Sequence, residues 1–134
     1  MKKLDNPSDA RMLSARRVLV VEDNVDLRID LRDLLSLEGY HVLTAADGRE
    51  ALACLAQNDV DIVVSDYEMP NMDGIALWKA LRLIEKTASL PFILVSTEAR
   101  PVITSDPGFR FLRKPIAISD LLSAIEQAAA AQRA

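Results

Sequence analysis

The sequence lacks long apolar runs, and it contains a single cysteine. Among its 134 residues Cys54 is that cysteine, so an internal disulfide is excluded and a reducing compartment is expected. No apolar stretch approaches the roughly 20 residues that a membrane-spanning helix needs. The first residues, MKKLDNPSDARM, also lack the apolar segment of a signal peptide. The chain is therefore predicted to be cytoplasmic, with no membrane partner.

The sequence also lacks an excess of positive charge. It has 16 lysine and arginine residues against 20 aspartate and glutamate residues, a formal net charge of −4. This balance provides no electrostatic attraction for nucleic acid, so direct binding of DNA or RNA is not expected. With 134 residues, half of them apolar, the chain can bury the core of one ordinary domain but not of two.

Residues 1–15 differ in character from the rest of the chain. They are polar, contain Pro7 and show no sustained period of apolar residues. Such a segment lacks the apolar surface that would hold it against a core, so it is predicted to form a flexible N-terminal arm. Residues 16–134 are predicted to form the domain.

Short apolar segments alternate with helical patterns along residues 16–134. The expected strands cover residues 18–21, 40–45, 60–65, 92–96 and 109–112, and apolar residues at helical spacing lie at 27–35, 51–55, 75–84 and 121–129. Asp47 and Glu50 resemble a capping box, Trp78 is expected on the rim of its helix, and Ser119 is expected to cap the last helix. The alternation predicts an α/β fold, a doubly wound five-stranded parallel sheet with helices on both faces.

One segment interrupts this alternation. Between the expected fourth and fifth strands, where a helix is due, the sequence reads TEARPVITSDPG at residues 97–108. Pro101 and Pro107 lie six residues apart, and the β-branched residues between them disfavour a helix. The fourth helix is therefore predicted to be degenerate or very short.

Acidic residues follow two of the expected strands. Glu22 and Asp23 come directly after the first strand, and Asp66 comes directly after the third. Ligands of a doubly wound sheet bind beyond the carboxyl ends of its strands, so these three carboxylates are expected to meet there. Like charges at short range repel one another, and hard oxygen ligands suit Mg²⁺. We therefore predict a Mg²⁺ site of Glu22, Asp23 and Asp66, with the backbone carbonyl of Glu68 as a further ligand.

A hydroxyl and an ammonium group follow the remaining strands. Ser96 ends the fourth strand, and Lys114 follows the fifth. Together with a metal ion they offer three positive or hydrogen-bonding partners to the three oxygens of a phosphoryl group. The arrangement predicts that Asp66 is a nucleophile that accepts a phosphoryl group as an acyl phosphate.

Four motifs resemble the CheY-like receiver domain of two-component response regulators. They are VLVVEDN, VVSDYEMPNMDG, FILVST and FLRKP, in this order, and the resemblance covers residues 17–133. It implies a flavodoxin-like fold with strand order 2-1-3-4-5. It also implies Mg²⁺-dependent phosphotransfer to aspartate from a sensor histidine kinase or a histidine phosphotransfer protein. A module of this kind is a phosphoacceptor rather than an enzyme, and it can catalyse its own phosphorylation and dephosphorylation.

The resemblance also assigns roles to individual residues. Asp66 matches the phosphoacceptor and Lys114 the lysine that pairs with the phosphoryl group. Glu22 and Asp23 match the acidic pair, with Asp23 as the direct metal ligand and Glu22 acting through water.

The remaining matches concern the conformational switch. Ser96 matches the switch hydroxyl, and Phe111 matches the aromatic residue whose rotamer follows it. The Lys114–Pro115 peptide bond is expected to be cis.

Several positions depart from the family pattern. Glu22 replaces the more frequent aspartate, and Phe111 lacks the hydroxyl of a tyrosine, so its switch is expected to be steric. Thr97 stands where a small alanine is usual, and we predict that it crowds an attacking water and slows dephosphorylation. The predicted weakness of the fourth helix argues against signalling through the face that this helix builds in other receivers.

Three other classes of protein share features with this sequence. A phosphorylation-independent binding module would use the same fold as a scaffold, and the intact acidic pair, Asp66 and Lys114 argue against it. A phosphatase of the haloacid-dehalogenase type expects an Asp-x-Asp pair after the first strand, which is absent. A flavodoxin expects a serine- and threonine-rich phosphate loop there, which is also absent. With no output domain after Ala134, the chain is expected to be a stand-alone receiver or a fragment of a larger kinase or regulator.

Overall fold

The structure is a computed structural model that describes residues 16–98 and 104–133. The predicted flexible arm of residues 1–15 lies outside the described residues. The strands are β1 (Arg17–Val21), β2 (His41–Ala45), β3 (Ile62–Asp66), β4 (Phe92–Ser96) and β5 (Phe109–Arg113). The helices of the described part are α2 (Val25–Leu37), α3 (Gly48–Gln57), α4 (Gly74–Arg82) and α5 (Ile118–Arg133), with a short 3₁₀ turn η1 (Glu85–Thr87).

The five strands form one parallel sheet in the order β2-β1-β3-β4-β5. This confirms the predicted fold class and strand order. In the register, Val21 pairs with Ser65 and Asp66 pairs with Val95. The carboxyl ends of β1, β3 and β4 therefore lie side by side at one edge of the sheet, where parallel sheets of this type bind their ligands.

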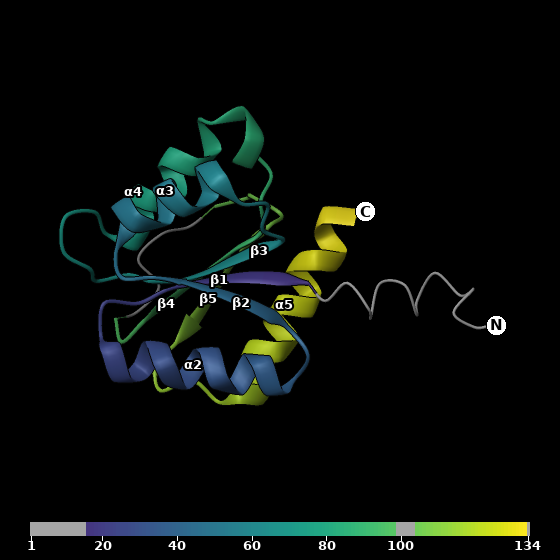
Figure 1. The fold of residues 1–134 in the computed structure, drawn as a ribbon. Coiled ribbons are helices and arrows are strands. Elements are labelled where there is room, and N and C mark those ends of the chain that lie inside the picture. The colour runs from purple at the N-terminus through teal and green to yellow at the C-terminus, as the bar shows by residue number, and fades with distance from the viewer. Residues whose placement is uncertain (1–15, 99–103, 134) are drawn as a thin grey trace.

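Helices cover both faces of the sheet (Figure 1). One face packs against α2 and α5, and the other packs against α3 and α4. Successive strand residues point to opposite faces, so Val18 and Val20 contact the first layer while Leu19 and Val21 contact the second. Because β1, β3 and β4 are covered on both sides, they appear in the sequence as continuous apolar runs.

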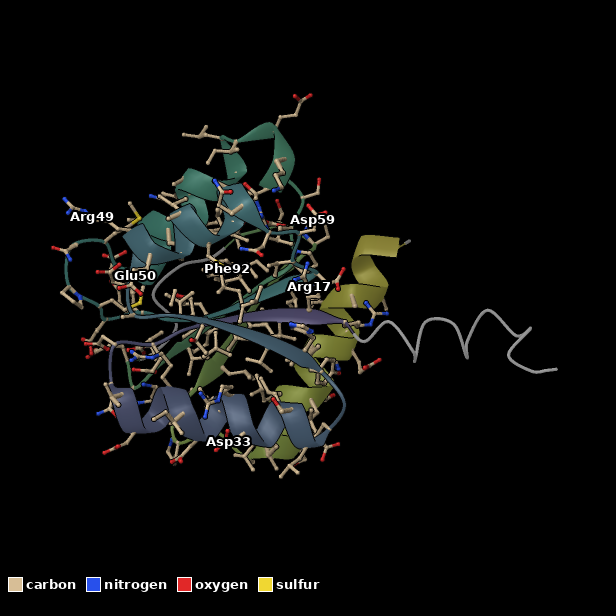
Figure 2. The ribbon with its side chains drawn as sticks, in the orientation of Figure 1. Arg17, Asp33, Arg49, Glu50, Asp59 and Phe92 are labelled. Carbon is tan, nitrogen blue, oxygen red and sulfur yellow. The ribbon has the colours of Figure 1, made fainter. Side chains whose placement is uncertain are left out.

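The interior is built mainly from aliphatic side chains. Figure 2 shows Phe92 inside the molecule, while Asp33 lies on the outer side of α2. Phe92 is fully buried, and its ring stacks on that of Phe109, with 6.2 Å between the ring centroids. Burial of an aromatic or aliphatic side chain of this size stabilises a fold by about 1.5–3 kcal/mol.

Three helices start from side-chain caps at the edge that holds the strand ends. Asn24, Asp47 and Asp73 are the N-cap residues of α2, α3 and α4, and each accepts a backbone hydrogen bond at 2.8–2.9 Å. At the expected capping box, the Glu50 carboxylate accepts from the Ala46 amide rather than from that of Asp47. These caps satisfy N–H groups that the first turn of a helix leaves without partners.

Some expectations about helix ends and burial are wrong. The helix expected to reach Ile84 ends at Arg82, because the chain turns there and the buried Thr87 hydroxyl donates to the Leu81 carbonyl at 2.7 Å. Trp78 is buried with 8% exposure instead of lying on a rim. The last helix begins at Ile118, so Ser119 lies within it rather than capping it.

The segment between β4 and β5 contains no helix in its described residues, 97–98 and 104–108. A turn of helix beginning at Pro101, which the sequence leaves open, lies outside the described residues. Asp106 attaches the segment to α4, because its carboxylate accepts from Arg82 Nε at 2.6 Å and from the Trp78 indole at 3.0 Å. Trp78 also packs against the ring of Phe109, with 4.7 Å between the ring centroids, within the core layer of α3 and α4.

Within the described part of the chain, no helix combines the length and the apolar character needed to cross a lipid bilayer.

Candidate phosphoacceptor site

Three carboxylates gather at the carboxyl edge of the sheet. Glu22 and Asp23 follow β1, and Asp66 is the last residue of β3. Each offers an oxygen that lies within 4.8 Å of the others. The neighbouring positions of β1 and β3 bring these residues together, although 43 positions separate Asp23 and Asp66 in the sequence (66 − 23).

Hydrogen bonds hold both the backbone and the side chain of Glu22. Its N–H donates to the Ala45 carbonyl at 3.0 Å, and its carbonyl accepts from the Arg28 guanidinium at 2.8 Å. Its carboxylate accepts a hydrogen bond from the backbone N–H of Asn24 at 3.2 Å. Glu22 is only 3% exposed, whereas Asp23 faces solvent. Asp23 is thus placed for direct contact with an ion that enters from water.

Lys114 supplies the positive charge of the site. Its ammonium lies 3.1 Å from Asp66 Oδ1 and 3.5 Å from Glu22 Oε1. The backbone N–H of Lys114 donates to the Ser96 carbonyl at 2.8 Å, which ties the end of β5 to the end of β4. The Lys114–Pro115 peptide bond is cis, as the resemblance implied.

The switch candidates lie beside these groups. Ser96 is 1% exposed, and its hydroxyl accepts a hydrogen bond from the Glu98 amide at 2.9 Å. Phe111 is half-buried and packs against the core layer of α3 and α4. Thr97 is exposed, and its carbonyl accepts from Arg113 Nε at 3.3 Å.

The negative charge of the site is not fully balanced. Burial raises the pKa of the Asp66 carboxyl, and the hydrogen bond and charge of Lys114 offset only part of this shift. Burial also raises the pKa of Glu22, with a smaller opposite effect of its hydrogen bond from Asn24. Burial by itself lowers the pKa of Lys114, but its contacts with Asp66 and Glu22 raise it overall. A further positive charge would stabilise the ionised carboxylates.

The donor set of the site fits Mg²⁺. Carboxylate oxygens open to water on one side are the ligands that this ion prefers. Asp23 and Asp66 supply such oxygens, and Glu22 lies close enough to act through water. Glu68 lies two residues beyond Asp66 with an exposed side chain, and its assignment as a backbone ligand remains a prediction.

Sequence reasoning missed the part that Gly74 plays at the site. Asp73 caps α4, and Gly74 is the first residue of that helix. In the structure Gly74 is buried, and a Cβ atom there would collide with the backbone carbonyl of Asp66 and lie 2.6 Å from a methyl group of Leu94. The Gly74 amide also donates to the Tyr67 carbonyl at 2.7 Å. The Asp-Gly pair after the loop was the only sequence signal for this close approach.

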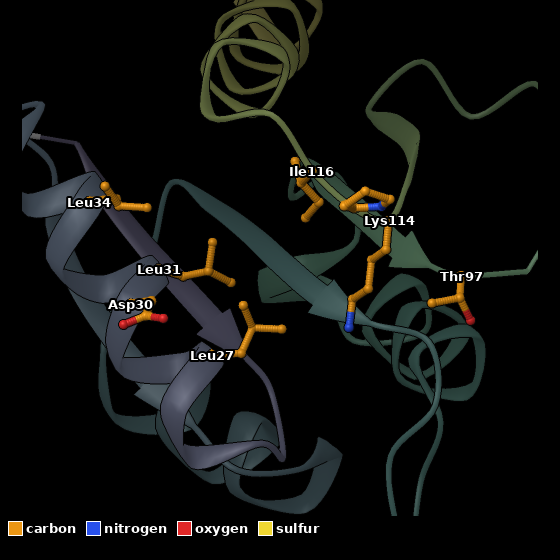
Figure 3. A pocket seen from close by; sticks show the side chains of 8 residues that line it. Leu27, Asp30, Leu31, Leu34, Thr97, Lys114 and Ile116 are labelled. Carbon is orange, nitrogen blue, oxygen red and sulfur yellow. The ribbon is translucent and has the colours of Figure 1, made fainter.

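An apolar cavity of about 560 Å³ adjoins the site (Figure 3). Leu27, Leu31 and Leu34 of α2 line one side of it, and Lys114 and Ile116 line the other. Lys114 therefore borders both this cavity and the carboxylate cluster.

A family model of the response regulator receiver domain matches residues 18–126. The chain belongs to the response regulator receiver family. Domains of this family are phosphoacceptor signalling modules of two-component systems rather than enzymes of the usual kind. The order of strands and the acidic cluster described above are those of such a domain.

Known proteins support this assignment at the level of sequence and structure. The receiver is 36% identical to the transcriptional regulatory protein PdtaR of Mycobacterium tuberculosis over 125 residues, which cover 90% of this chain and 60% of PdtaR. It matches the Vibrio cholerae chemotaxis protein CheY4 with 32% identity and a TM-score of 0.77, covering 85% of this chain and 98% of CheY4. It matches the response regulator TrrA of Thermotoga maritima, solved in complex with Mg²⁺ and BeF, with 26% identity and a TM-score of 0.74, covering 84% and 98%.

The receiver spans little more than half the length of the curated relative PdtaR. The match with CheY4 in contrast covers nearly the whole of that chain. The shared part is therefore the receiver itself.

Proposed function

We propose that this receiver accepts a phosphoryl group on Asp66, with Mg²⁺, from a sensor histidine kinase or a histidine phosphotransfer protein. The observation that carries the proposal is the placement of Lys114 at 3.1 Å from Asp66 Oδ1 beside the cluster of three carboxylates. A purely structural ion pair would not need two further acidic groups at the same place. The complex of the relative TrrA with Mg²⁺ and BeF supports the same chemistry.

The transfer requires little of the protein beyond position and charge. An oxygen of Asp66 forms a bond to phosphorus while the bond between phosphorus and the histidine nitrogen of the donor breaks, and the electron pair stays on the leaving imidazole. Asp66 is held by β3, whose backbone pairs with β1 and β4 on both sides. Lys114 and the amide groups near the strand ends then face the phosphoryl oxygens that carry the developing charge.

Asp23, Asp66 and the Glu68 carbonyl would hold the Mg²⁺ ion, with Glu22 acting through water. When bound, the ion neutralises negative charge that otherwise repels the phosphodonor. Glu22 and Lys114 are in turn held by backbone hydrogen bonds, so both are in place before the ion arrives.

The proposed switch begins at Ser96. In the structure the Ser96 hydroxyl accepts from the Glu98 amide, so it is engaged with its own loop. A phosphoryl group on Asp66 adds charge and three acceptor oxygens, toward which the hydroxyl would turn as a donor. Phe111 would then follow into the space that the loop vacates, and its half-buried position leaves it free to do so without opening the core.

The cavity beside Lys114 supports the proposed partner. Its walls are leucines of α2 on one side and Ile116 on the other. An amphipathic helix that presents a phosphohistidine would find an apolar groove next to the acceptor carboxylate.

The test is to incubate the unphosphorylated protein with acetyl phosphate and Mg²⁺ and to weigh the intact product. We expect the mass of one added phosphoryl group, no addition after treatment with a chelator, and none in the Asp66→Asn variant. Asp106→Asn is the matched control, because it removes a carboxylate outside the site and should leave labelling unchanged. Absence of labelling in the wild type, also with a panel of phosphorylated histidine kinases, would favour a phosphorylation-independent binding module.

A further inference from the structure

The loop of residues 67–73, which joins β3 to α4, contains a backbone conformation that needs support. Asn71 has a φ of +71°, the only positive φ of a non-glycine residue in the described part of the chain. The Met72 amide donates to the Pro70 carbonyl at 2.8 Å, so residues 70–72 form a tight three-residue turn. Such conformations persist only where the surroundings impose them, and they are often found at functional sites.

A hydrogen bond from another element holds this turn. The Asn71 side-chain amide donates to Asp47 Oδ2 at 3.1 Å. The other oxygen of Asp47 accepts from the Glu50 amide at 2.9 Å, as the N-cap of α3. The hydrogen bond from Glu50 has the largest effect on the pKa of Asp47 and that from Asn71 the next largest. Both lower this pKa, so the carboxylate that accepts from Asn71 stays ionised. One carboxylate therefore connects the start of α3 to the loop that follows the phosphoacceptor.

Close packing reinforces this connection. A Cβ atom at Gly48 would lie 2.8 Å from Met72 Sδ and 2.9 Å from Met72 Cβ. Only a glycine lets the Met72 side chain lie directly against the first turn of α3. Figure 2 shows this end of α3, where Arg49 and Glu50 are labelled, beside the loop.

We propose that Asp47, Gly48, Asn71 and Met72 form a clamp that positions the backbone carbonyl of Glu68 for the metal ion. The inference rests on the metal site of the proposed function. Glu68 lies between two fixed points, because the clamp holds the loop at Asn71 and the Gly74 amide holds it at the Tyr67 carbonyl at 2.7 Å. Mg²⁺ demands near-ideal octahedral geometry, so a ligand on a loop is useful only if the loop cannot shift. The four clamp residues are positioning residues, because they act through Glu68 and not on the phosphoryl group.

The test measures binding of Mg²⁺ and of Ca²⁺ to the unphosphorylated protein by titration calorimetry. Asn71→Gly removes the side-chain amide and keeps the backbone freedom that the positive φ requires. Gly48→Ala forces Met72 away from α3. Loss of groups that orient metal ligands typically weakens binding by 10–100-fold, and we expect about a 10-fold weaker Mg²⁺ affinity in each variant. The loss for Ca²⁺ should be several times smaller, because Ca²⁺ tolerates irregular geometry.

Gly39→Ala is the matched control. Gly39 has a φ of +97°, and a Cβ atom there would meet no neighbour within 4 Å. The variant should lose stability through backbone strain at the opposite edge of the sheet and keep the Mg²⁺ affinity of the wild type. A drop in Mg²⁺ affinity in Gly39→Ala equal to that in the clamp variants would overturn the inference.

Two further outcomes test the positioning role of the clamp separately from the phosphoacceptor role of Asp66. If the folded clamp variants bind Mg²⁺ as the wild type does, or lose Ca²⁺ binding to the same extent as Mg²⁺ binding, the clamp has no positioning role. If the wild type binds Mg²⁺ but takes no phosphoryl group from acetyl phosphate or from phosphorylated kinases, the proposed function fails while the result for the clamp still stands.

Discussion

Two clusters of charged side chains lie at opposite ends of β5, and both place a carboxylate against a cation. After β5, Lys114 faces the carboxylates of Asp66 and Glu22, and burial raises the pKa of both acids. Before β5, Asp106 faces Arg82. Burial alone raises the pKa of Asp106, but its hydrogen bonds from Arg82, Gly108 and Trp78 outweigh this effect and lower the pKa overall.

The difference lies in how many donors serve each carboxylate. The Asp106 carboxylate accepts three hydrogen bonds, from Arg82, Trp78 and Gly108, and its single charge faces the single charge of Arg82. The acidic site has three carboxylates for one ammonium. Removal of one partner from a balanced pair leaves the other charge buried without compensation, whereas an unbalanced cluster already contains uncompensated charge and keeps affinity for a cation.

The largest effect should follow from breaking the balanced cluster. Asp106→Ala leaves Arg82 and Trp78 without their acceptor, and we expect a loss of about 3 kcal/mol in the free energy of unfolding, measured with urea. Affinity for Mg²⁺ should not change. Asp59→Ala is the control, because its ion pair with Lys86 at 3.6 Å is exposed and contributes at most about 1 kcal/mol. Equal losses in the two variants would contradict the comparison.

Adding a cation to the unbalanced cluster should stabilise the protein. At a Mg²⁺ concentration one hundred times the dissociation constant, linkage predicts a gain of about 2.7 kcal/mol in the free energy of unfolding. Asp23→Asn should lose most of this gain at the same Mg²⁺ concentration, and Asp106→Asn should keep it. Urea unfolding with Mg²⁺ and with a chelator measures the difference. Equal stability in the two buffers would refute the metal site.

A smaller effect concerns the lifetime of the phosphorylated acid. Thr97 is exposed beside Ser96, and Thr97→Ala should open the path of an attacking water. We expect hydrolysis about fivefold faster, which corresponds to about 1 kcal/mol of barrier. The half-life of the acyl phosphate after removal of the donor measures it, and an unchanged half-life would show that Thr97 does not shield the site.

The smallest effect should appear in the pH dependence of stability without Mg²⁺, where the two clusters act with opposite sign. Because the pKa of Asp106 is lowered by folding, its contribution is present above the ordinary carboxylate value of about 3.9 and is lost as the pH falls through the folded pKa. Because the pKa of Asp66 is raised, its contribution is present below that value and is lost as the pH rises through the folded pKa.

Substitution of each acid separates the two contributions. Compared with the wild type, Asp106→Asn should remove part of the stability loss in acid, and Asp66→Asn should remove part of the loss on raising the pH towards neutrality. Urea unfolding across the pH range in chelator measures both. A slope of the same sign for both carboxyls would contradict the assignment.

The strands could be predicted because their pattern is local. The apolar runs of β3 and β4 are buried on both faces, and each ends at a polar residue of the site, Asp66 and Ser96. Neighbouring parallel strands end at the same edge, so the meeting of Glu22, Asp23 and Asp66 followed from the order of the elements. The roles of these residues in phosphotransfer remain predictions, since geometry alone tests their position and not their chemistry.

The end of α4 could not be predicted in the same way. Leu83 and Ile84 continue the apolar pattern of the helix, yet both are exposed, because the cap that ends the helix comes from the Thr87 hydroxyl. Trp78 was expected on a rim because its acceptor, Asp106, lies 28 residues away. Periodicity describes only which face of an element is apolar, and it contains no information about which loop will cover that face.

The class of fold, the order of the elements and the identity of the charged residues at the strand ends depend on residue type and short-range spacing, so they could be predicted from the sequence. The attachment of particular loops to particular helices depends instead on contacts between distant parts of the chain. The contacts of Asp47 with Asn71 and of Arg82 with Asp106 each join residues 24 positions apart, and in each pair one residue lies in a loop without a periodic pattern. Their formation depends on the packing of the whole domain, and no local pattern of the chain encodes it.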